Sequence, residues 1–216
     1  MTALPDKYRY IVVEGPIGAG KTTLARKLAE VTGASTLLED PGANPFLPGF
    51  YQDRARYALP AQLFFLFQRV NQVRDLGQGD MFKQATVADF ILDKDPLFAR
   101  LTLNDDELNL YQQIYNSIKP QSATPDLVIY LKKSLPKLKE RIAMRGRDYE
   151  KEIPDDYLIN LNRYYDDWML HYDQGKKLII PSDDLDFLHN PKHFDQVCSM
   201  VLSALDQRDL FLESQP

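Results

Sequence analysis

The stretch IVVEGPIGAGKTTLARKLAE, residues Ile11–Glu30, decides the fold of this chain. Within it, GPIGAGKT at Gly15–Thr22 matches the pattern G-x-x-x-x-G-K-[ST], with an apolar strand-like run before it and an amphipathic helical pattern after it. Glycines let such a loop curl so that backbone N–H groups point at phosphate oxygens, and the following helix adds its positive end. The stretch therefore predicts a nucleotide-binding loop.

Specific roles follow for the residues of this loop. We expect Lys21 to place its charge near the β- and γ-phosphates and the Thr22 hydroxyl to ligate Mg²⁺. The expected nucleotide-binding residues are Gly15, Pro16, Ile17, Gly18, Ala19, Gly20, Lys21, Thr22 and Thr23. The loop does not say whether the phosphate goes to water, to a protein or to a small molecule.

Apolar, β-rich runs alternate with helical patterns along the whole chain. The expected strands are Tyr8–Glu14, Ser35–Glu39, Ala85–Asp89, Asp126–Leu131 and Lys177–Pro181. The expected helices are Thr22–Gly33, Leu59–Gly77, Asp105–Ile118 with Asp105 as its cap, one opened by Pro136, Pro154–His171 and Pro191–Ala204. The Pro- and Gly-rich stretch Asp40–Phe50 predicts a loop. The alternation predicts an α/β fold with a five-stranded parallel sheet and helices on both faces, as one domain over residues 1–216.

Composition narrows the class of protein. The net charge is -5 with His neutral, which argues against a general nucleic-acid binder. The single cysteine, Cys198, excludes an internal disulfide and lies in an apolar helical pattern that predicts burial. The N-terminus lacks a signal-peptide pattern and no apolar run reaches membrane-spanning length, so we expect a cytoplasmic protein without a membrane partner.

Two carboxylates, Glu39 and Asp89, close predicted strands beside the phosphate loop. Ligands of open parallel sheets bind at the carboxyl ends of the strands. Phosphoryl transfer to an alcohol needs a metal and a group that accepts the hydroxyl proton. Glu39 could be that base and Asp89 a ligand on the metal side; the alternative is that each only caps the loop after it.

Three arginines, Arg141, Arg145 and Arg147, gather at the end of one predicted helix and in the turn after it. Cations at a helix C-terminus are favoured by the helix dipole, so a solvated helix end is the simpler reading. Beside a phosphate loop, the cluster instead favours an arginine-rich lid, about 145–153, that closes over the transferred phosphate and excludes water.

With these motifs, the chain resembles the deoxyribonucleoside kinase family, in the group of deoxycytidine, deoxyguanosine and deoxyadenosine kinases. The resemblance runs from about Tyr8 to about Trp168. Its most specific parts are the Tyr–Gln–Arg spacing in YQDRARYALPAQLFFLFQR (51–69) and the lid stretch RIAMRGRDYEKEIPDDYL (141–158). The motif EGPIGAGKTT and the acidic residues after the second and third strands agree with it.

The resemblance implies a role for each matching residue. Glu39 would accept the proton of the sugar 5′-hydroxyl, and Tyr51 and Glu150 would hold the 3′-hydroxyl. Gln62 would make paired hydrogen bonds to the base edge, and Arg69 with Asp95 would form an ion pair at the far end of the base pocket. The implied metal-side residues are Thr22 and Asp89, and the implied lid residues are Arg141, Arg145 and Arg147.

One departure from the family pattern matters. The family places an arginine directly after the acidic residue of the third strand, but ADFILDKD (88–95) has Phe90 there. We hypothesise that Lys94, about one helical turn further on, supplies the missing positive charge. Lysine is a point charge rather than a planar fork, so the geometry or rate would differ.

The resemblance implies an ATP- and Mg²⁺-dependent kinase that converts a deoxyribonucleoside to its 5′-monophosphate in nucleotide salvage. Arg69 with Asp95 favours purine deoxynucleosides, then deoxycytidine, and the family suggests a homodimer. Two alternatives stay open: a nucleoside monophosphate kinase of the thymidylate kinase type, and a non-catalytic P-loop regulator. Phe90 disfavours the first, because that enzyme needs an arginine beside its acceptor phosphate.

Overall fold

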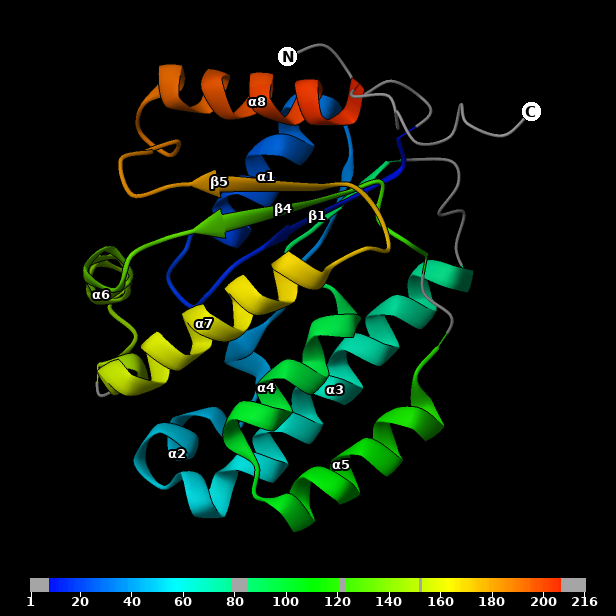
Figure 1. The fold of residues 1–216 in the computed structure, drawn as a ribbon, viewed down its shortest axis with the longest axis vertical. Helices are drawn as coiled ribbons and strands as arrows, with labels where there is room; N and C mark the ends of the chain where they lie inside the picture. Colours follow the sequence, from blue (N-terminus) through cyan, green and yellow to red (C-terminus); the bar gives the residue numbers. More distant parts are fainter. Residues whose placement is uncertain (1–7, 79–84, 121–122, 152, 207–216) are drawn as a thin grey trace.

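The computed structural model of the protein describes residues 8–78, 85–120, 123–151 and 153–206. Five parallel strands form one sheet in the order β2-β3-β1-β4-β5 (Figure 1). The strands are β1 Tyr10–Glu14, β2 Ser35–Leu37, β3 Thr86–Ala88, β4 Leu127–Lys132 and β5 Lys177–Pro181. The predicted parallel α/β fold is confirmed.

Eight α-helices and three short 3-10 turns complete the described part of the chain. The helices are α1 Lys21–Thr32, α2 Leu47–Gln52, α3 Arg54–Gln78, α4 Asp95–Thr102, α5 Asp105–Ile118, α6 Leu135–Arg145, α7 Asp155–His171 and α8 Pro191–Asp206. The turns are η1 Pro41–Ala43, η2 Leu92–Lys94 and η3 Asp148–Glu150. No helix among these is long and apolar enough to cross a membrane.

The central strands β1, β3 and β4 are largely buried, and strand alternation divides the side chains of the sheet between two cores. Ile11 and Val13 of β1 pack with α1 and α8, whereas Val12 packs with α2, α3 and α7. A third apolar cluster packs α3 against α4 and α5. Figure 1 shows α1 and α8 above the sheet, with α7, α3 and α4 below it. Cys198 lies in the first core, as predicted.

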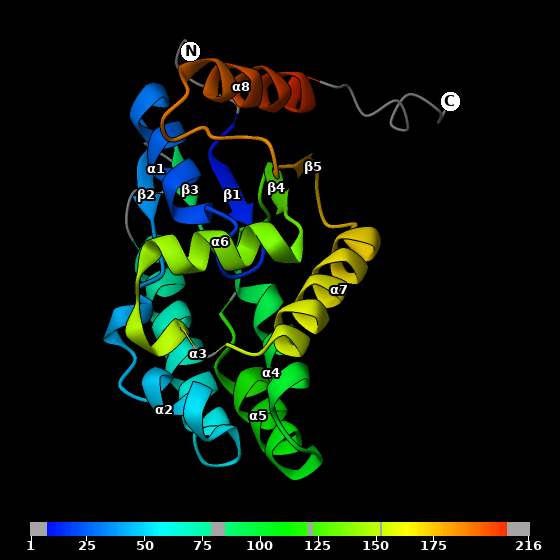
Figure 2. The same cartoon turned by 90° about the vertical axis from the view of Figure 1, so that its left-hand side faces the viewer.

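The carboxyl ends of the strands lie at the end of the sheet that α6 covers (Figure 1 and Figure 2). The arrowheads of β4 and β5 point toward α6 in Figure 1, and Figure 2 shows α6 lying across this end of the sheet. Asp126 marks the opposite end: its carboxylate accepts the backbone N–H groups of Arg9 and Tyr10 at 2.6 and 2.8 Å. Asp126 therefore has a structural role, at the end of the sheet away from the phosphate loop.

Three local predictions are wrong, and one helix was missed. Leu47–Gln52 is a helix rather than a loop, because Pro48 occupies its first turn and Leu47 and Phe50 are buried in the core. The long helix begins at Arg54 rather than Leu59 and continues through Pro60. The helix α4, opened by Pro96, was not predicted. Asn104 caps α5 in place of Asp105, in a capping box with Glu107.

Candidate active site

The phosphate loop, Gly15–Thr22, follows β1 at the carboxyl end of the sheet. Gly15, Gly18 and Gly20 have φ of 149°, 86° and 100°, a range that favours glycine. At Gly15 a Cβ would lie 2.8 Å from the Leu131 carbonyl oxygen, so no other residue fits the close passage of the loop past β4. The loop therefore has the backbone geometry that its sequence predicts.

Lys21 folds back onto this loop. Its Nζ donates to the carbonyl oxygens of Gly15 and Pro16 at 2.8 and 3.2 Å. Burial lowers the pKa of Lys21, and the positive charge of Lys94 lowers it further, to about 8. The lysine thus lies beside the loop's own carbonyls, where a phosphate would offer it a stronger partner.

Asp89, directly after β3, links the phosphate loop to the segment after β2. Its Oδ2 accepts the Thr22 hydroxyl at 2.5 Å, and its Oδ1 accepts the backbone N–H of Glu39 at 2.8 Å. A hydroxyl and a carboxylate in contact are hard oxygen donors of the kind Mg²⁺ prefers. Thr22 and Asp89 therefore fit a magnesium ion that is bound mainly by phosphate oxygens.

Two cavities meet at this loop. The larger, of about 540 Å³, extends from Lys21 and Thr22 past Glu39 to the side chains of α2, α3 and α4. The smaller, of about 400 Å³, runs along the loop between α6 and the segment Leu185–His189 that follows β5. Lys21, Thr22, Arg145 and Arg147 line both cavities. The phosphate loop is therefore the junction of the two cavities.

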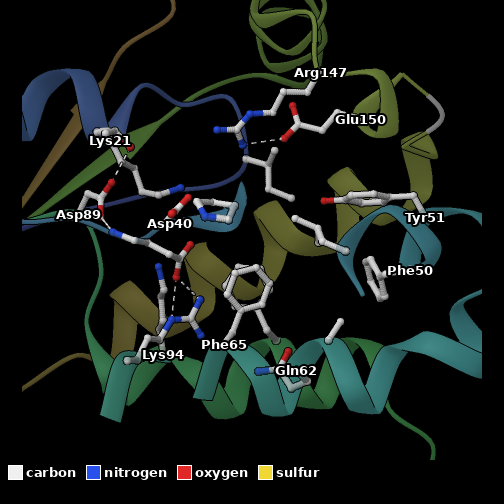
Figure 3. A pocket seen from close by; sticks show the side chains of 18 of the residues that line it. Lys21, Asp40, Phe50, Tyr51, Gln62, Phe65, Asp89, Lys94, Arg147 and Glu150 are labelled. Atoms are coloured by element: carbon white, nitrogen blue, oxygen red, sulfur yellow. Dashed lines mark hydrogen bonds and ion pairs between the residues drawn. The ribbon is translucent and has the colours of Figure 1, made fainter. Parts of the chain in front are cut away.

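Gln62 and Arg69 line the floor of the larger cavity, and the fully buried Asp95 lies behind them, in contact with both. Arg69 Nη1 donates to Asp95 Oδ2 at 2.6 Å, so the ion pair expected from the resemblance is formed. Asp95 Oδ1 also accepts from Gln62 Nε2 and, at 2.7 Å, from the Tyr111 hydroxyl. In Figure 3, Gln62 and Phe65 rise from α3 toward the cavity.

Glu39 lies between this floor and the phosphate loop, and its partner is again Arg69. Arg69 Nε and Nη2 donate to Glu39 Oε1 at 2.7 and 2.5 Å. Burial alone would raise the pKa of Glu39, but the charges of Arg69, Lys94 and Lys21 outweigh it and lower the pKa to about 2. Glu39 is therefore a carboxylate at neutral pH, as a proton acceptor must be.

Tyr51 and Glu150 form the wall opposite Lys21 (Figure 3). Tyr51 stacks on Tyr149, with ring centroids 6.3 Å apart, and burial raises its pKa well above the usual value. The buried Glu150 accepts from Arg145 Nη2 at 2.6 Å and from Arg147 Nη1 at 3.3 Å. This wall carries a hydroxyl and a carboxylate side by side.

The three predicted lid arginines divide into two groups. Arg145 and Arg147 pair with Glu150 and reach the larger cavity, whereas Arg141 lines the smaller cavity with its Nη2 at 3.9 Å from Asp186 Oδ1. Residue 152 of the predicted lid lies outside the described residues. The arginines flank the phosphate loop from two sides.

Lys94 lies at the floor of the larger cavity, in a buried cluster. Its ammonium binds Glu14, with 2.9 Å to Oε1, and Glu14 also accepts the Tyr165 hydroxyl at 3.1 Å and the backbone N–H of Ile91 at 2.8 Å. Trp168 packs edge-on against Tyr165, with ring centroids 6.4 Å apart. Lys94 lines the cavity and lowers the pKa of Glu39, while Phe90 is fully buried in the third apolar cluster.

Sequence reasoning missed three residues of this network: Glu14, Tyr111 and Tyr165. Glu14 stands inside the quoted motif, but its contact with Lys94 spans 80 positions and depends on the β1–β3 pairing. Tyr165 lies in an aromatic helical stripe that predicts only packing. Tyr111, one of several apolar residues on its helix, carries no local signal for its contact with Asp95.

Comparisons with known proteins agree with this geometry. The family model described as deoxynucleoside kinase matches residues 11–206. A deoxyguanosine kinase of Bacillus subtilis is 34% identical over 197 residues, covering 89% of this chain and 95% of that protein. A deoxyadenosine kinase of Lactobacillus acidophilus is 32% identical over 194 residues, covering 83% and 88%.

Solved structures show the same fold. A deoxyadenosine kinase from M. mycoides, described with the products dCMP and a flexible dCDP bound, superposes with a TM-score of 0.77 at 22% identity, covering 90% of this chain and 99% of that one. The same enzyme with bound dATP gives a TM-score of 0.77 at 23% identity. With a family model that spans nearly all of the described residues, this chain belongs to the deoxynucleoside kinase family and is a phosphotransferase.

Proposed function

We propose that the protein transfers the γ-phosphate of ATP to the 5′-hydroxyl of a deoxyribonucleoside. The observation that carries the proposal is the junction of the two cavities at Lys21, Thr22, Arg145 and Arg147, with Glu39 on the larger side. The smaller cavity, along the phosphate loop, would take the donor. The larger one, with an amide, an ion pair and apolar walls, would take the acceptor.

Each residue has a chemical task in this scheme. Lys21 and the loop N–H groups would hold the transferred phosphate, and Arg145 and Arg147 would offset the charge that develops on it. Glu39, ionised and in the larger cavity, would accept the hydroxyl proton as the oxygen attacks. Bound Mg²⁺, held by Thr22 and Asp89, would neutralise phosphate charge.

The acceptor would be held at both of its ends. Tyr51 and Glu150 offer a hydroxyl and a carboxylate to the sugar 3′-hydroxyl, and Gln62 offers an amide to the base edge. The Arg69–Asp95 pair presents a polar floor that penalises a base with no matching edge. The names of the relatives, deoxyguanosine and deoxyadenosine kinases, support purine deoxynucleosides as preferred acceptors, and we propose deoxycytidine as the next best.

A phosphate-transfer screen tests this function. The acceptors are the four deoxynucleosides, their ribonucleoside forms and their 5′-monophosphates, each with labelled ATP and Mg²⁺. We expect the highest kcat/KM with a purine deoxynucleoside. Transfer to a monophosphate alone would instead identify a thymidylate kinase type of enzyme, and no transfer to any of them would identify a non-catalytic regulator.

Lys94 would supply the positive charge that Phe90 lacks. Its ammonium is buried at the cavity floor, and its charge reaches both Glu39 and Lys21. Lys94→Ala should lower kcat by about tenfold or more, since it removes a charge near the reacting groups. It should also destabilise the fold by about 3–5 kcal/mol, because Glu14 stays buried without its cation. Unchanged turnover in the variant would refute this role.

A homodimer built through the long helices is proposed as well. Phe67 on α3 and Leu110 on α5 are each 47% exposed, so both helices carry apolar side chains that a second copy would cover. Light scattering on the purified protein would give its mass in solution. The cytoplasmic location, the salvage role and the single-domain assignment of residues 1–216 stay predictions.

A further inference from the structure

Arg69 connects two carboxylates that come from different segments of the chain. Its side chain is 4% exposed and lies between Glu39, after β2, and Asp95, at the start of α4. Nε and Nη2 donate to Glu39, while Nη1 donates to Asp95. A planar guanidinium can serve two acceptors in this way, whereas a lysine ammonium cannot keep the same fork geometry.

The Asp95 side of this bridge is fixed from several directions. Asp95 is fully buried, and its Oδ1 accepts from Gln62 and from the Tyr111 hydroxyl. Tyr111 belongs to α5 and is itself fully buried, so the carboxylate is tied to a packed core. The orientation of the Arg69 fork is therefore set by residues at the base-reading end of the cavity.

The Glu39 side is held differently. Glu39 stands two residues beyond the end of β2, and its backbone N–H donates to Asp89. That bond fixes the main chain but not the carboxylate. Phe90, after β3, offers no charge, and the Lys94 ammonium is bound to Glu14. The guanidinium in contact with Glu39 thus comes from α3, from the same side chain that faces Asp95.

We propose that Arg69 is a positioning residue for Glu39 and connects nucleobase recognition to the reacting end of the acceptor. The proposal rests on the proposed function, in which Glu39 accepts the hydroxyl proton. A carboxylate displaced by about 1 Å loses about a hundredfold in rate, so the orientation of the fork acts on kcat. Contacts of the base with Gln62, which is bonded to Asp95, then influence turnover as well as binding, because Asp95 and Glu39 share Arg69.

Arg69→Lys tests this role with little disturbance of charge. The variant keeps one cation between the two buried carboxylates but loses the fork. Arg74→Lys is the matched control: Arg74 lies on the exposed side of the same helix, with Nη2 bonded to the Ile118 carbonyl, outside both cavities. We expect kcat at saturating deoxynucleoside to fall at least about tenfold in Arg69→Lys and to stay at the wild-type value in Arg74→Lys.

A second acceptor separates positioning from base reading. In this acceptor, the base is replaced by an apolar ring of the same shape with no hydrogen-bonding edge. If Arg69 only reads the base, Arg69→Lys leaves kcat for this acceptor unchanged, and that result overturns the proposal. If Arg69 positions Glu39, kcat falls for this acceptor too, by a similar factor.

Crystal structures of wild type, Arg69→Lys and Arg74→Lys without acceptor give a readout that is independent of turnover. We expect the Glu39 carboxylate to move in Arg69→Lys alone. A carboxylate that keeps its wild-type place in Arg69→Lys overturns the proposal even if the enzyme acts on another acceptor. Wild-type protein inactive on every nucleoside would instead contradict the proposed function, and the crystal structures would still decide the positioning role.

Discussion

The two binding spaces that meet at Lys21 are built in different ways. The phosphate loop consists of eight consecutive residues, with Gly15 packed against β4. The larger cavity is assembled from the ends of β2 and β3, from α2, α3 and α4, and from the turn after α6. Its geometry depends on side chains that meet over long sequence separations. A local motif can specify the phosphate loop, whereas the larger cavity forms only once the sheet and its helices have folded.

The largest effect is expected when the proposed base of the larger cavity, Glu39, is replaced. Glu39→Gln keeps an oxygen acceptor for Arg69 but cannot take a proton, so kcat should fall by about 10²–10⁴-fold with little change in donor KM. Steady-state kinetics with the best acceptor measures it. If kcat stayed within a factor of three, the proton would have to leave by another route, and Glu39 would be only a partner of Arg69.

A second test removes the charge of the phosphate loop. Lys21→Met should lower kcat by about 10²–10³-fold, because one cation no longer faces the transferred phosphate. Lys139→Met is the control, since Lys139 is an exposed residue of α6 that pairs with Asp155. Equal losses in the two variants would point to a general effect on the protein rather than to the loop.

The protonation of Lys21 gives a pH signature for the same loop. The pKa of Lys21 in the free protein is lowered to about 8 by burial and by Lys94, so the ammonium loses its proton as pH rises through that value. The parameter kcat/KM for the donor reports the free enzyme, and we expect it to fall above pH about 8. A flat profile up to pH 10 would contradict this assignment.

A smaller effect is expected from the loop backbone. In Gly18→Ala, a Cβ at φ 86° would lie 3.0 Å from Ile142 Cγ1 and from the Leu138 carbonyl oxygen, so the loop must shift against α6. Donor KM should rise about tenfold, from strain of about 1–3 kcal/mol. Gly33→Ala is the matched control, because its φ is 68° but its Cβ meets nothing within 4 Å. It should lower stability and leave donor KM unchanged.

The smallest effect is expected from Tyr111, beyond the end of the larger cavity that is formed by Gln62 and Arg69. Tyr111→Phe removes one hydrogen bond to the buried Asp95 carboxylate and should lower the free energy of unfolding by about 1–3 kcal/mol. Acceptor KM should rise a few-fold while donor KM stays constant. Urea titration and kinetics measure both quantities, and a change in donor KM would show that the two spaces are not separate.

The same contrast explains what the sequence could predict. The phosphate loop, all five strands and the partners Arg69 and Asp95 were within reach, because each has a local motif, a period or a family spacing. The helix at Leu47–Gln52 was not, because its Pro48 and Gly49 suggested a loop although Leu47 and Phe50 are buried in the core. Burial overrides propensity there, and burial is decided by the whole fold.

The ion pairs of the larger cavity show a second limit. The family resemblance implied that Arg69 meets Asp95, but not that it also holds Glu39. That contact depends on how far the segment after β2 reaches toward α3, a distance that no periodicity encodes. Lys94 was expected to serve the cavity, yet its direct partner is Glu14, from the strand before the phosphate loop.

Trp168 gives the protein an optical reporter of its own. It is the single tryptophan of the chain, and its indole packs against Tyr165, whose hydroxyl binds the Glu14 that holds Lys94. Any ligand that shifts the Lys94 cluster changes the surroundings of this one fluorophore. We expect emission excited near the red edge of the absorption band to report such ligands in real time, without a label and without turnover.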